Sequence, residues 1–386
     1  MKTHFGFLFS MARLSGLPLF QSHTAYSTTP TKLMCFYFWS LSIIRLLTFL
    51  YSCVSMSFLL RVATLRFTYL SFNICGTVVV LLTISKRHKI RKAVETLIQL
   101  SLELNRDSFI GSRHSIFLGI FQCIFVVIVA VSQIVFYTSK KQESRFANVT
   151  IFGTPLYNHT RRIFLDIHYF SGTFTYTNSS AVVCTASLMF FNIYTALDNI
   201  TKWYHRRIQK MLNKNPINSD DIFENISFFR RIFNCIGEVE EAIALSTLFL
   251  YGASITWIFS SFNALIIHEN AYKSSSALLI VGITCFMALL VVLMLTISAS
   301  NIVLRDKALK RSLVHFAEKP FMFGVLHNRQ TCHYTLMHHI NLLSQLIREY
   351  KFQLTGGHMF VIQRGLIFTG LGIIFSYGMV IDQLNN

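Results

Sequence analysis

The chain has 386 residues, of which 53% are apolar and 14% aromatic, and only 13% are charged. Soluble domains carry about 25% charged residues, so this composition excludes a soluble globular protein and predicts an integral membrane protein. The formal net charge of +18 does not indicate nucleic-acid binding, because the basic residues lie between apolar runs instead of on one face of a soluble module. No nucleic-acid partner is expected.

Seven apolar segments are long enough to cross a bilayer, which takes about 20 predominantly apolar residues. They lie at 36–60, 67–85, 115–137, 170–197, 242–267, 275–304 and 356–384. None shows the two-residue alternation of a transmembrane β-barrel, so we expect an all-α polytopic membrane protein with seven transmembrane helices. Residues 1–35 precede the first span, and Arg13 interrupts their apolar run early. We therefore expect a cytoplasmic tail there instead of a cleaved signal peptide.

The basic residues predict the orientation of the chain. With the N-terminus in the cytoplasm, 25 of the 35 lysines and arginines fall in cytoplasmic segments and 8 in external ones. Such a bias is typical of the positive-inside rule. The glycosylation acceptors Asn148 and Asn158, each in an Asn-X-Thr tripeptide, fall in an external loop under the same arrangement. The sequence thus predicts a plasma-membrane protein with a cytoplasmic N-terminus and an extracellular C-terminus.

Two segments outside the spans show apolar residues at helical spacing. The predicted organisation is a cytoplasmic tail at 1–35, transmembrane helices 1–4 at 36–200, a cytoplasmic helical segment at 201–241, helices 5–6 at 242–304, a second cytoplasmic helical segment at 305–355 and a final span at 356–386. The spaced residues are Ile222, Ile226, Phe229, Ile232 and Phe233 in one segment and Ile340, Leu343, Leu346, Ile347 and Tyr350 in the other. These amphipathic helices either pack together beneath the membrane or lie on the lipid headgroups.

Three charged residues fall in or beside the predicted spans, where a charge is costly and indicates function by default. We expect Arg45 to extend along its helix to the cytoplasmic surface. Arg364, at the cytoplasmic start of the last span, either faces an inner vestibule or pairs with a carboxylate. Asp382 provides a negative charge at the extracellular end of that span.

No enzyme motif is present, since the chain lacks HExxH, GxSxG, Walker and dinucleotide-binding glycine patterns. The histidines His327, His333, His338 and His339 crowd one segment, but none of them forms the i, i+4 pair that places two metal ligands on one helix face. The eight cysteines include no CxxC pair. We expect neither enzymatic activity nor a cofactor or metal site.

Near the C-terminus the sequence contains Ser376-Tyr377, then Gly378 to Asp382, then Gln383-Leu384. This pattern resembles the insect gustatory receptor family, whose last span carries Thr-Tyr, five variable residues and Gln-Phe. Upstream, Thr355-Gly356-Gly357 and Gln363-Arg364 align without gaps on the family's small-residue and Asp-Arg region. The chain departs from the family pattern at Ser376, Leu384 and Gln363. Gly378 stands where sugar-receptor members place an acidic residue, which argues against a sugar receptor.

The resemblance implies a homo- or hetero-tetrameric, ligand-gated, non-selective cation channel, in which four copies of the last span line the pore and the cytoplasmic helices form an intersubunit anchor. Carried over by position, the pore and gate residues are Ser376, Tyr377, Val380, Asp382, Gln383 and Leu384. A ring of leucines can close a pore by dewetting, and inward rotation of the Gln383 amide would rewet it. The other reading of Gln383 is a hydrogen bond at the headgroup boundary.

The resemblance also implies a small-molecule pocket in the outer half of each subunit's helical bundle. The candidate residues are aromatic or polar and lie at suitable depth; they are Phe121, Gln122, Phe125, Tyr169, Tyr176, Trp257 and Phe262. An aromatic site with few polar groups suits flat apolar or alkaloid-like tastants, such as bitter compounds, better than polyols. The alternatives are a transporter, which should show internal repeats, and a G-protein-coupled receptor of opposite topology.

Overall fold

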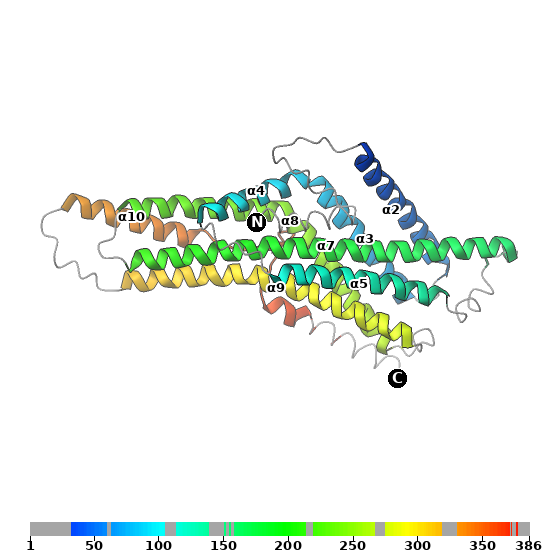
Figure 1. Cartoon of the computed structure of the whole chain (residues 1–386). Helices are drawn as coiled ribbons and strands as arrows, with labels where there is room; N and C mark the ends of the chain where they lie inside the picture. The colour runs from blue at the N-terminus through cyan, green and yellow to red at the C-terminus, as the bar shows by residue number, and fades with distance from the viewer. Residues whose placement is uncertain are drawn as a thin grey trace.

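The computed structural model describes residues 32–59, 63–104, 113–138, 150–151, 154–155, 158–213, 219–266, 275–318 and 330–370, together with residues 372 and 376. This part of the chain is almost entirely helical (Figure 1). Its helices are α2 (Lys32–Leu59), α3 (Ala63–Ser85), α4 (Arg87–Leu104), α5 (Arg113–Thr138), α7 (Asn158–Leu212), α8 (Ser219–Ile266), α9 (Ser275–Glu318) and α10 (Gln330–Glu349). The strands form two short antiparallel pairs, β1 (Thr150–Ile151) with β2 (Thr154–Pro155) and β3 (Thr355–Gly356) with β4 (Phe360–Val361).

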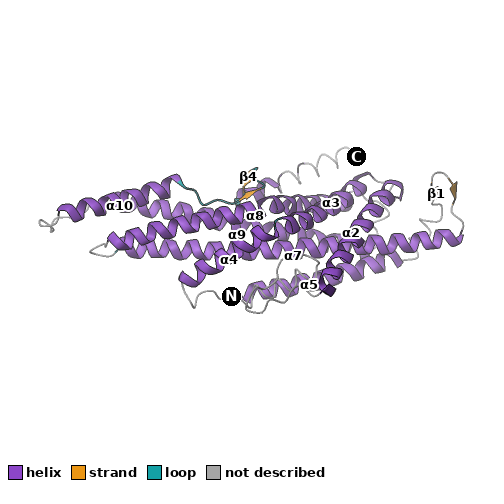
Figure 2. Ribbon diagram, turned by 90° about the horizontal axis from the view of Figure 1, so that it is seen from above, coloured by secondary structure: helices purple, strands orange, loops and turns teal. Residues whose placement is uncertain are grey.

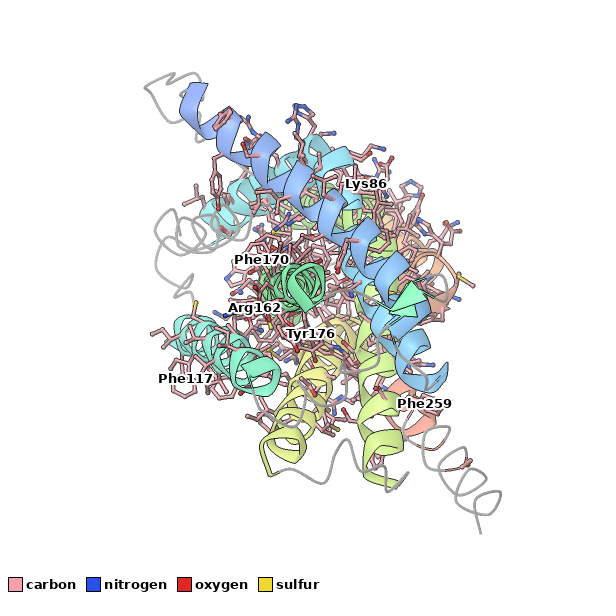
Figure 3. All side chains as sticks on the ribbon, turned by 90° about the vertical axis from the view of Figure 1, so that its right-hand side faces the viewer. Lys86, Phe117, Arg162, Phe170, Tyr176 and Phe259 are labelled. Carbon is pink, nitrogen blue, oxygen red and sulfur yellow. The ribbon has the colours of Figure 1, made fainter. Side chains whose placement is uncertain are left out.

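Helix α7 is the centre of the molecule. Seen end-on in Figure 3, it is surrounded by α2, α3, α5, α8 and α9, and it packs directly against each of them. All residues from 182 to 190 are buried, including the small residues Ala186 and Ser187. Small side chains allow neighbouring helix backbones to approach closely, which explains how one helix accommodates so many neighbours.

The three longest helices exceed the thickness of a membrane. Helices α7, α8 and α9 contain 55, 48 and 44 residues, which corresponds to lengths of roughly 65–80 Å against a hydrocarbon core of about 30 Å. In the described part of the chain these three are long and apolar enough to cross a bilayer, and shorter apolar stretches occupy Ser40–Tyr51, Asn73–Ser85 and Phe117–Ser132. The helical class is confirmed, whereas the number of spans and the orientation of the termini stay predictions.

The parts of the long helices beyond their apolar segments form a second bundle with α4 and α10, which we call the distal bundle (Figures 1 and 2). Ile222, Phe229 and Ile232 on α8 are buried in it, as are Leu343 and Ile347 on α10. These are the residues whose helical spacing left two alternatives open. Since α10 packs on α8, these faces lie against other helices, as the packing alternative predicts, and their position beneath a membrane stays a prediction.

The last apolar segment does not begin as a helix at residue 356. Residues 355–361 form the β3–β4 hairpin, and helical residues begin at Gly365. Gly357 and His358 have φ values of 60° and 61°, which no right-handed helix accommodates. Arg364 follows the hairpin and donates a hydrogen bond from Nη2 to Oδ1 of Asn301 at 3.1 Å, so its partner is an amide and not a carboxylate.

The prediction that Arg45 extends to the membrane surface is wrong. Its Nη2 donates a hydrogen bond to Oδ1 of Asn178 on α7 at 2.8 Å, which ties α2 to the central helix. The neighbouring α2 residues Ile43, Leu46 and Leu47 are exposed on the outer side of the bundle. A polar acceptor within reach on α7 therefore keeps the guanidinium inside, while apolar side chains occupy the outward face.

Candidate functional site

The structure brings most of the predicted ligand residues into one region between α5, α7, α8 and α9. Phe121 and Phe125 on α5 and Tyr176 on α7 belong to one apolar cluster with Cys184 and Met287. We call these five residues the aromatic cluster. Sequence reasoning missed Cys184 and Met287, because the pattern of a helix that is apolar on all sides does not reveal which face meets α5.

Ring contacts extend the aromatic cluster in two directions. The Tyr176 ring lies 6.2 Å from the ring of Trp257 on α8, in a tilted arrangement, so this tyrosine links α7 to α8. The Phe121 ring meets that of Phe286 on α9 edge-on at 6.3 Å. Such aromatic pairs each contribute about 0.5–1.5 kcal/mol beyond their buried area. The aromatic rings of this region thus come from α5, α7, α8 and α9.

Gln122 is the polar residue of this region. Its side chain is 1% exposed and lies on the same buried face of α5 as Phe125 and Val129, three and seven residues further on. Neither Nε2 nor Oε1 has a hydrogen-bond partner among the described residues. A buried polar group without a partner costs about 1–3 kcal/mol. Gln122 therefore has an unused donor and acceptor that a bound molecule can satisfy.

Four of the seven predicted ligand residues are not members of the aromatic cluster, namely Gln122, Tyr169, Trp257 and Phe262. Phe262 packs against the main core of the molecule, and Tyr169 is half-buried one to two helical turns before Tyr176. Phe262 and Tyr169 were selected by residue type and by their expected depth in the membrane, and depth does not distinguish the faces of a helix. The residues that the structure brings together are thus Phe121, Phe125 and Tyr176, with Trp257 through its ring contact and Gln122 on the shared face.

The β3–β4 hairpin is the second candidate element, because it leads into the helix that starts at Gly365. Glu240 on α8 holds it: the carboxylate accepts hydrogen bonds from the backbone N–H of Thr355, at 3.0 Å to Oε2, and from the Thr355 hydroxyl. Nδ1 of His358 lies 3.5 Å from Oε1 of the same carboxylate. The backbone N–H of Gly357 donates to the carbonyl oxygen of Ala244 at 2.9 Å. The hairpin is thus fastened to one face of α8.

Glycine fits both positions after Thr355 better than a residue with a side chain. A Cβ on Gly357 would lie 2.8 Å from Cδ2 of Leu248, and its φ of 60° is unfavourable for any residue with a side chain. A Cβ on Gly356 would overlap the ring of Phe360. The resemblance singled out these glycines by position, and the structure provides the physical reason.

Buried hydroxyl pairs connect the hairpin's support to the rest of the bundle. The Tyr194 and Thr247 hydroxyls lie 3.0 Å apart and link α7 to α8, and those of Tyr251 and Thr296 lie 2.6 Å apart and link α8 to α9. The Tyr251 ring also meets the Phe360 ring of the hairpin edge-on at 6.1 Å. A shift of α8 would therefore be transmitted to the hairpin.

The predicted gate lies almost entirely outside the described residues. Ser376 is helical and exposed, whereas Tyr377, Val380, Asp382, Gln383 and Leu384 are not described. Asn148 is likewise outside the described residues, and Asn158 is the first residue of α7, with its side chain not described. In the described part of the chain no group of three or more His, Cys, Asp or Glu side chains is arranged to hold a metal ion.

Comparison with known proteins gives a match in fold. No family model matches the sequence, and no curated protein matches it. Among solved structures, the insect olfactory receptor OR5 from Machilis hrabei in complex with eugenol aligns with a TM-score of 0.76 and 11% identity, over 99% of this chain and 98% of that chain. A second structure of OR5 from Machilis hrabei aligns with a TM-score of 0.69 and 12% identity over the same shares. The chain thus shares the complete fold of an insect olfactory receptor.

Proposed function

We propose that the chain is a subunit of a chemosensory, ligand-gated, non-selective cation channel of the insect gustatory-receptor type, opened by a small extracellular tastant that is not a sugar. The observation that carries this proposal is the fold likeness to an olfactory receptor over 99% of the chain, end to end. It supports a receptor channel over a transporter, and the C-terminal register of Ser376-Tyr377 with Gln383-Leu384 supports the gustatory type. OR5 was solved with eugenol, a small aromatic molecule.

The ligand binds at the aromatic cluster in this proposal. An aromatic or alkaloid-like compound packs against Phe121, Phe125 and Tyr176, while one polar group of the compound pairs with the Gln122 amide. Sugars need several hydrogen-bonding partners, and the cluster offers few. The pairing recovers part of the cost of burying the free amide, so compounds with a single polar group gain most.

Opening follows from a shift in the balance between two arrangements of the bundle. A ligand that contacts α5, α7 and α9 stabilises the arrangement in which those contacts are best, and it shifts the population by its difference in affinity. Helix α8 shares hydroxyl pairs with α7 and α9, and through Glu240 it holds the hairpin that begins the last span. The pore helix then moves at Gln383 and Leu384, where four copies in a tetramer close the pore by dewetting.

A recording without G-protein signalling tests this function. Cells that express the chain, alone or with a related receptor subunit, should show cation currents when a panel of small aromatic and alkaloid-like compounds is applied, with GDP-β-S in the pipette to block G proteins. Alanine at Gln383 or Leu384 should alter the resting leak or the ion permeation. A chain that reaches the surface but gives no current, or gives one that GDP-β-S abolishes, contradicts the proposal.

The orientation has its own test. An epitope at the N-terminus should bind antibody only after the cells are permeabilised, and Asn148 or Asn158 should carry glycan that a glycosidase removes. An N-terminal epitope that is accessible on intact cells contradicts the inverted topology and favours a G-protein-coupled arrangement.

A further inference from the structure

Helices α7 and α9 carry a row of basic residues just beyond their apolar segments. On α7, Lys202, Arg206 and Lys210 recur every fourth residue, which places them along one side of the helix. On α9, Lys307 and Arg311 have the same spacing. Lys202 is half-buried, and the other four residues are exposed. We call these five residues the basic face.

The two halves of the basic face open to the same side of the molecule. Helices α7 and α9 run side by side in the same direction (Figure 1), and two contacts set their rotation: Arg305 Nε to Asp198 Oδ1 at 3.3 Å, and His205 Nε2 to Ser312 Oγ at 2.9 Å. At 100° per residue, the basic residues of α7 lie about 50–130° round from this contact line, and those of α9 lie about 110–150° round in the opposite sense. For two parallel helices, opposite rotations point to one common side.

Nothing among the described residues neutralises the basic face. None of its five members forms an ion pair or a hydrogen bond with another described residue, and the nearby carboxylates are engaged elsewhere. Asp198 is paired with Arg305, and Asp306, which is 6% exposed, with Lys310 at 2.8 Å. Five like charges held together without counter-charges attract a multivalent anion.

An apolar stripe on α9 leads directly into the basic face. Phe286, Leu293, Ile297 and Leu304 are 54%, 39%, 45% and 44% exposed, and their spacings of seven, four and seven residues keep them on one side of the helix. The next exposed residues on that side are Lys307 and Arg311. Apolar surface that continues into clustered cations has the two chemistries of an anionic lipid, namely acyl chains and phosphate.

We propose that the basic face binds the phosphorylated headgroup of an anionic membrane lipid, such as a phosphoinositide, whose acyl chains lie along the α9 stripe. A cluster of four to eight lysines and arginines beside a membrane span is typical of sites for such headgroups. Under the proposed topology this face is cytoplasmic, so the leaflet assignment rests on the proposed function, whereas binding itself requires only the residues described above. A second copy of the same face is disfavoured as the occupant because the two sets of cations would repel each other.

Binding to the purified full-length chain tests the site without reference to channel activity. The protein in detergent is titrated with dioctanoyl phosphatidylinositol 4,5-bisphosphate, inositol 1,4,5-trisphosphate and dioctanoylglycerol, and bound adducts are followed by native mass spectrometry. The lipid should bind with the highest affinity, the free headgroup at least about tenfold more weakly and the uncharged glyceride more weakly still. Added salt should weaken binding of the lipid.

Matched variants locate the site. The triple change Lys202→Gln, Arg206→Gln, Lys210→Gln should weaken binding of the phosphoinositide roughly 100-fold, since each basic residue near an anionic headgroup contributes about a factor of five. The control Lys89→Gln, Lys92→Gln, Arg231→Gln removes the same charge from a face where the cations are paired, and it should change affinity less than about threefold. Thermal unfolding verifies that both variants are folded.

The outcomes separate the possible occupants. Equal affinity for the lipid and the free trisphosphate would overturn the lipid assignment in favour of a soluble phosphate. A change in oligomeric state of the triple variant, with lipid binding intact, would identify an interface between copies and overturn the proposal. Equal weakening in both triple variants would show that only net charge matters. Channel currents without lipid binding would support the proposed function and overturn the lipid site. Lipid binding without currents would support the lipid site and contradict the proposed function.

Discussion

The hairpin at 355–361 and the region of the aromatic cluster differ in whether their polar groups have hydrogen-bond partners. In the hairpin, Thr355 satisfies both its N–H and its hydroxyl on Glu240, and Gly357 donates to α8. Beside the aromatic cluster, the Gln122 amide is buried with neither atom paired among the described residues. A turn whose polar groups have hydrogen-bond partners is held in one geometry, whereas a buried amide without partners can still bind a polar group of a ligand. The comparison predicts that the hairpin is intolerant of change and that the cluster tolerates change but alters its ligand preference.

The largest expected effect comes from Gly357→Ala. The new Cβ would meet Leu248 at 2.8 Å and would hold an unfavourable φ of 60°. Together, backbone strain and overpacking should cost about 2–5 kcal/mol, enough to abolish surface expression. Thermal unfolding of the purified protein and surface labelling measure the effect.

Gly237→Ala is the matched control for the hairpin glycine. Gly237 lies in α8, and nothing stands within 4 Å of the Cβ that alanine would add. This change should raise stability by up to about 1 kcal/mol through helix propensity. A Gly357→Ala protein as stable as the wild type would show that the hairpin adapts, and the comparison between the two regions would fail.

Glu240→Ala should have the next largest effect, because it leaves the N–H and hydroxyl of Thr355 without their acceptor. The side chain of Glu240 is 14% exposed, so little water can replace it, and the loss should be about 1–3 kcal/mol. The maximal ligand-evoked current should also fall, since α8 no longer holds the start of the last helix. Glu240→Gln retains an acceptor oxygen and should lie between the alanine variant and the wild type. Equal losses in both variants would show that charge, and not hydrogen bonding, holds the hairpin.

The same comparison shows how far the sequence predicted the structure. Continuous apolar runs predicted helices at 36–60 and 115–137, and the structure places α2 and α5 within a few residues of those bounds. The last span was misjudged at its start because Gly356 to Ile362 is mostly apolar, while its hairpin shape depends on tertiary contacts with α8. Hydropathy is a local property, and it contains no information about a partner 115 residues away in the chain.

The candidate site was predictable by residue type but not by face. Phe121, Phe125 and Tyr176 were selected as aromatic residues at suitable depth, and they do meet. Phe262 met the same criterion and is not a member of this cluster. Arg45 was predicted to extend to the membrane surface. The sequence did not reveal its acceptor Asn178, which lies on a helix more than 100 residues later. Positions of side chains between helices depend on helix rotation, which a single sequence does not specify.

Gln122→Leu tests whether the buried Gln122 amide binds a polar group of the ligand. Removing an unpaired buried amide should leave stability unchanged or raise it by about 1 kcal/mol. The half-maximal concentration of ligands with a hydrogen-bonding group should rise roughly 10- to 100-fold, while purely apolar ligands should act as before. Dose–response currents measure both effects. Phe125→Leu is the matched control, and it should weaken both ligand classes alike. A clear loss of stability in Gln122→Leu would mean that the amide has a structural partner.

The smallest expected effect comes from breaking the ion pair between Arg231 on α8 and Glu103 on α4. Nη1 of Arg231 lies 2.5 Å from Oε2 of Glu103. The hydrogen bond from Arg231 lowers the pKa of Glu103 below its usual range. The unfolded chain therefore binds a proton first on acidification, so the stabilisation is present above about pH 4.5 and is lost as the pH falls through the lowered pKa. Both side chains are about half exposed, 46% and 48%, which limits the pair to a few tenths of a kcal/mol. Thermal unfolding of wild type and Arg231→Gln at about pH 7 and about pH 2 should show a small difference at the higher pH that disappears at the lower one, where Glu103 is protonated in the folded chain as well. A difference that persists at the lower pH would attribute the effect to packing of the arginine stem instead of to its charge.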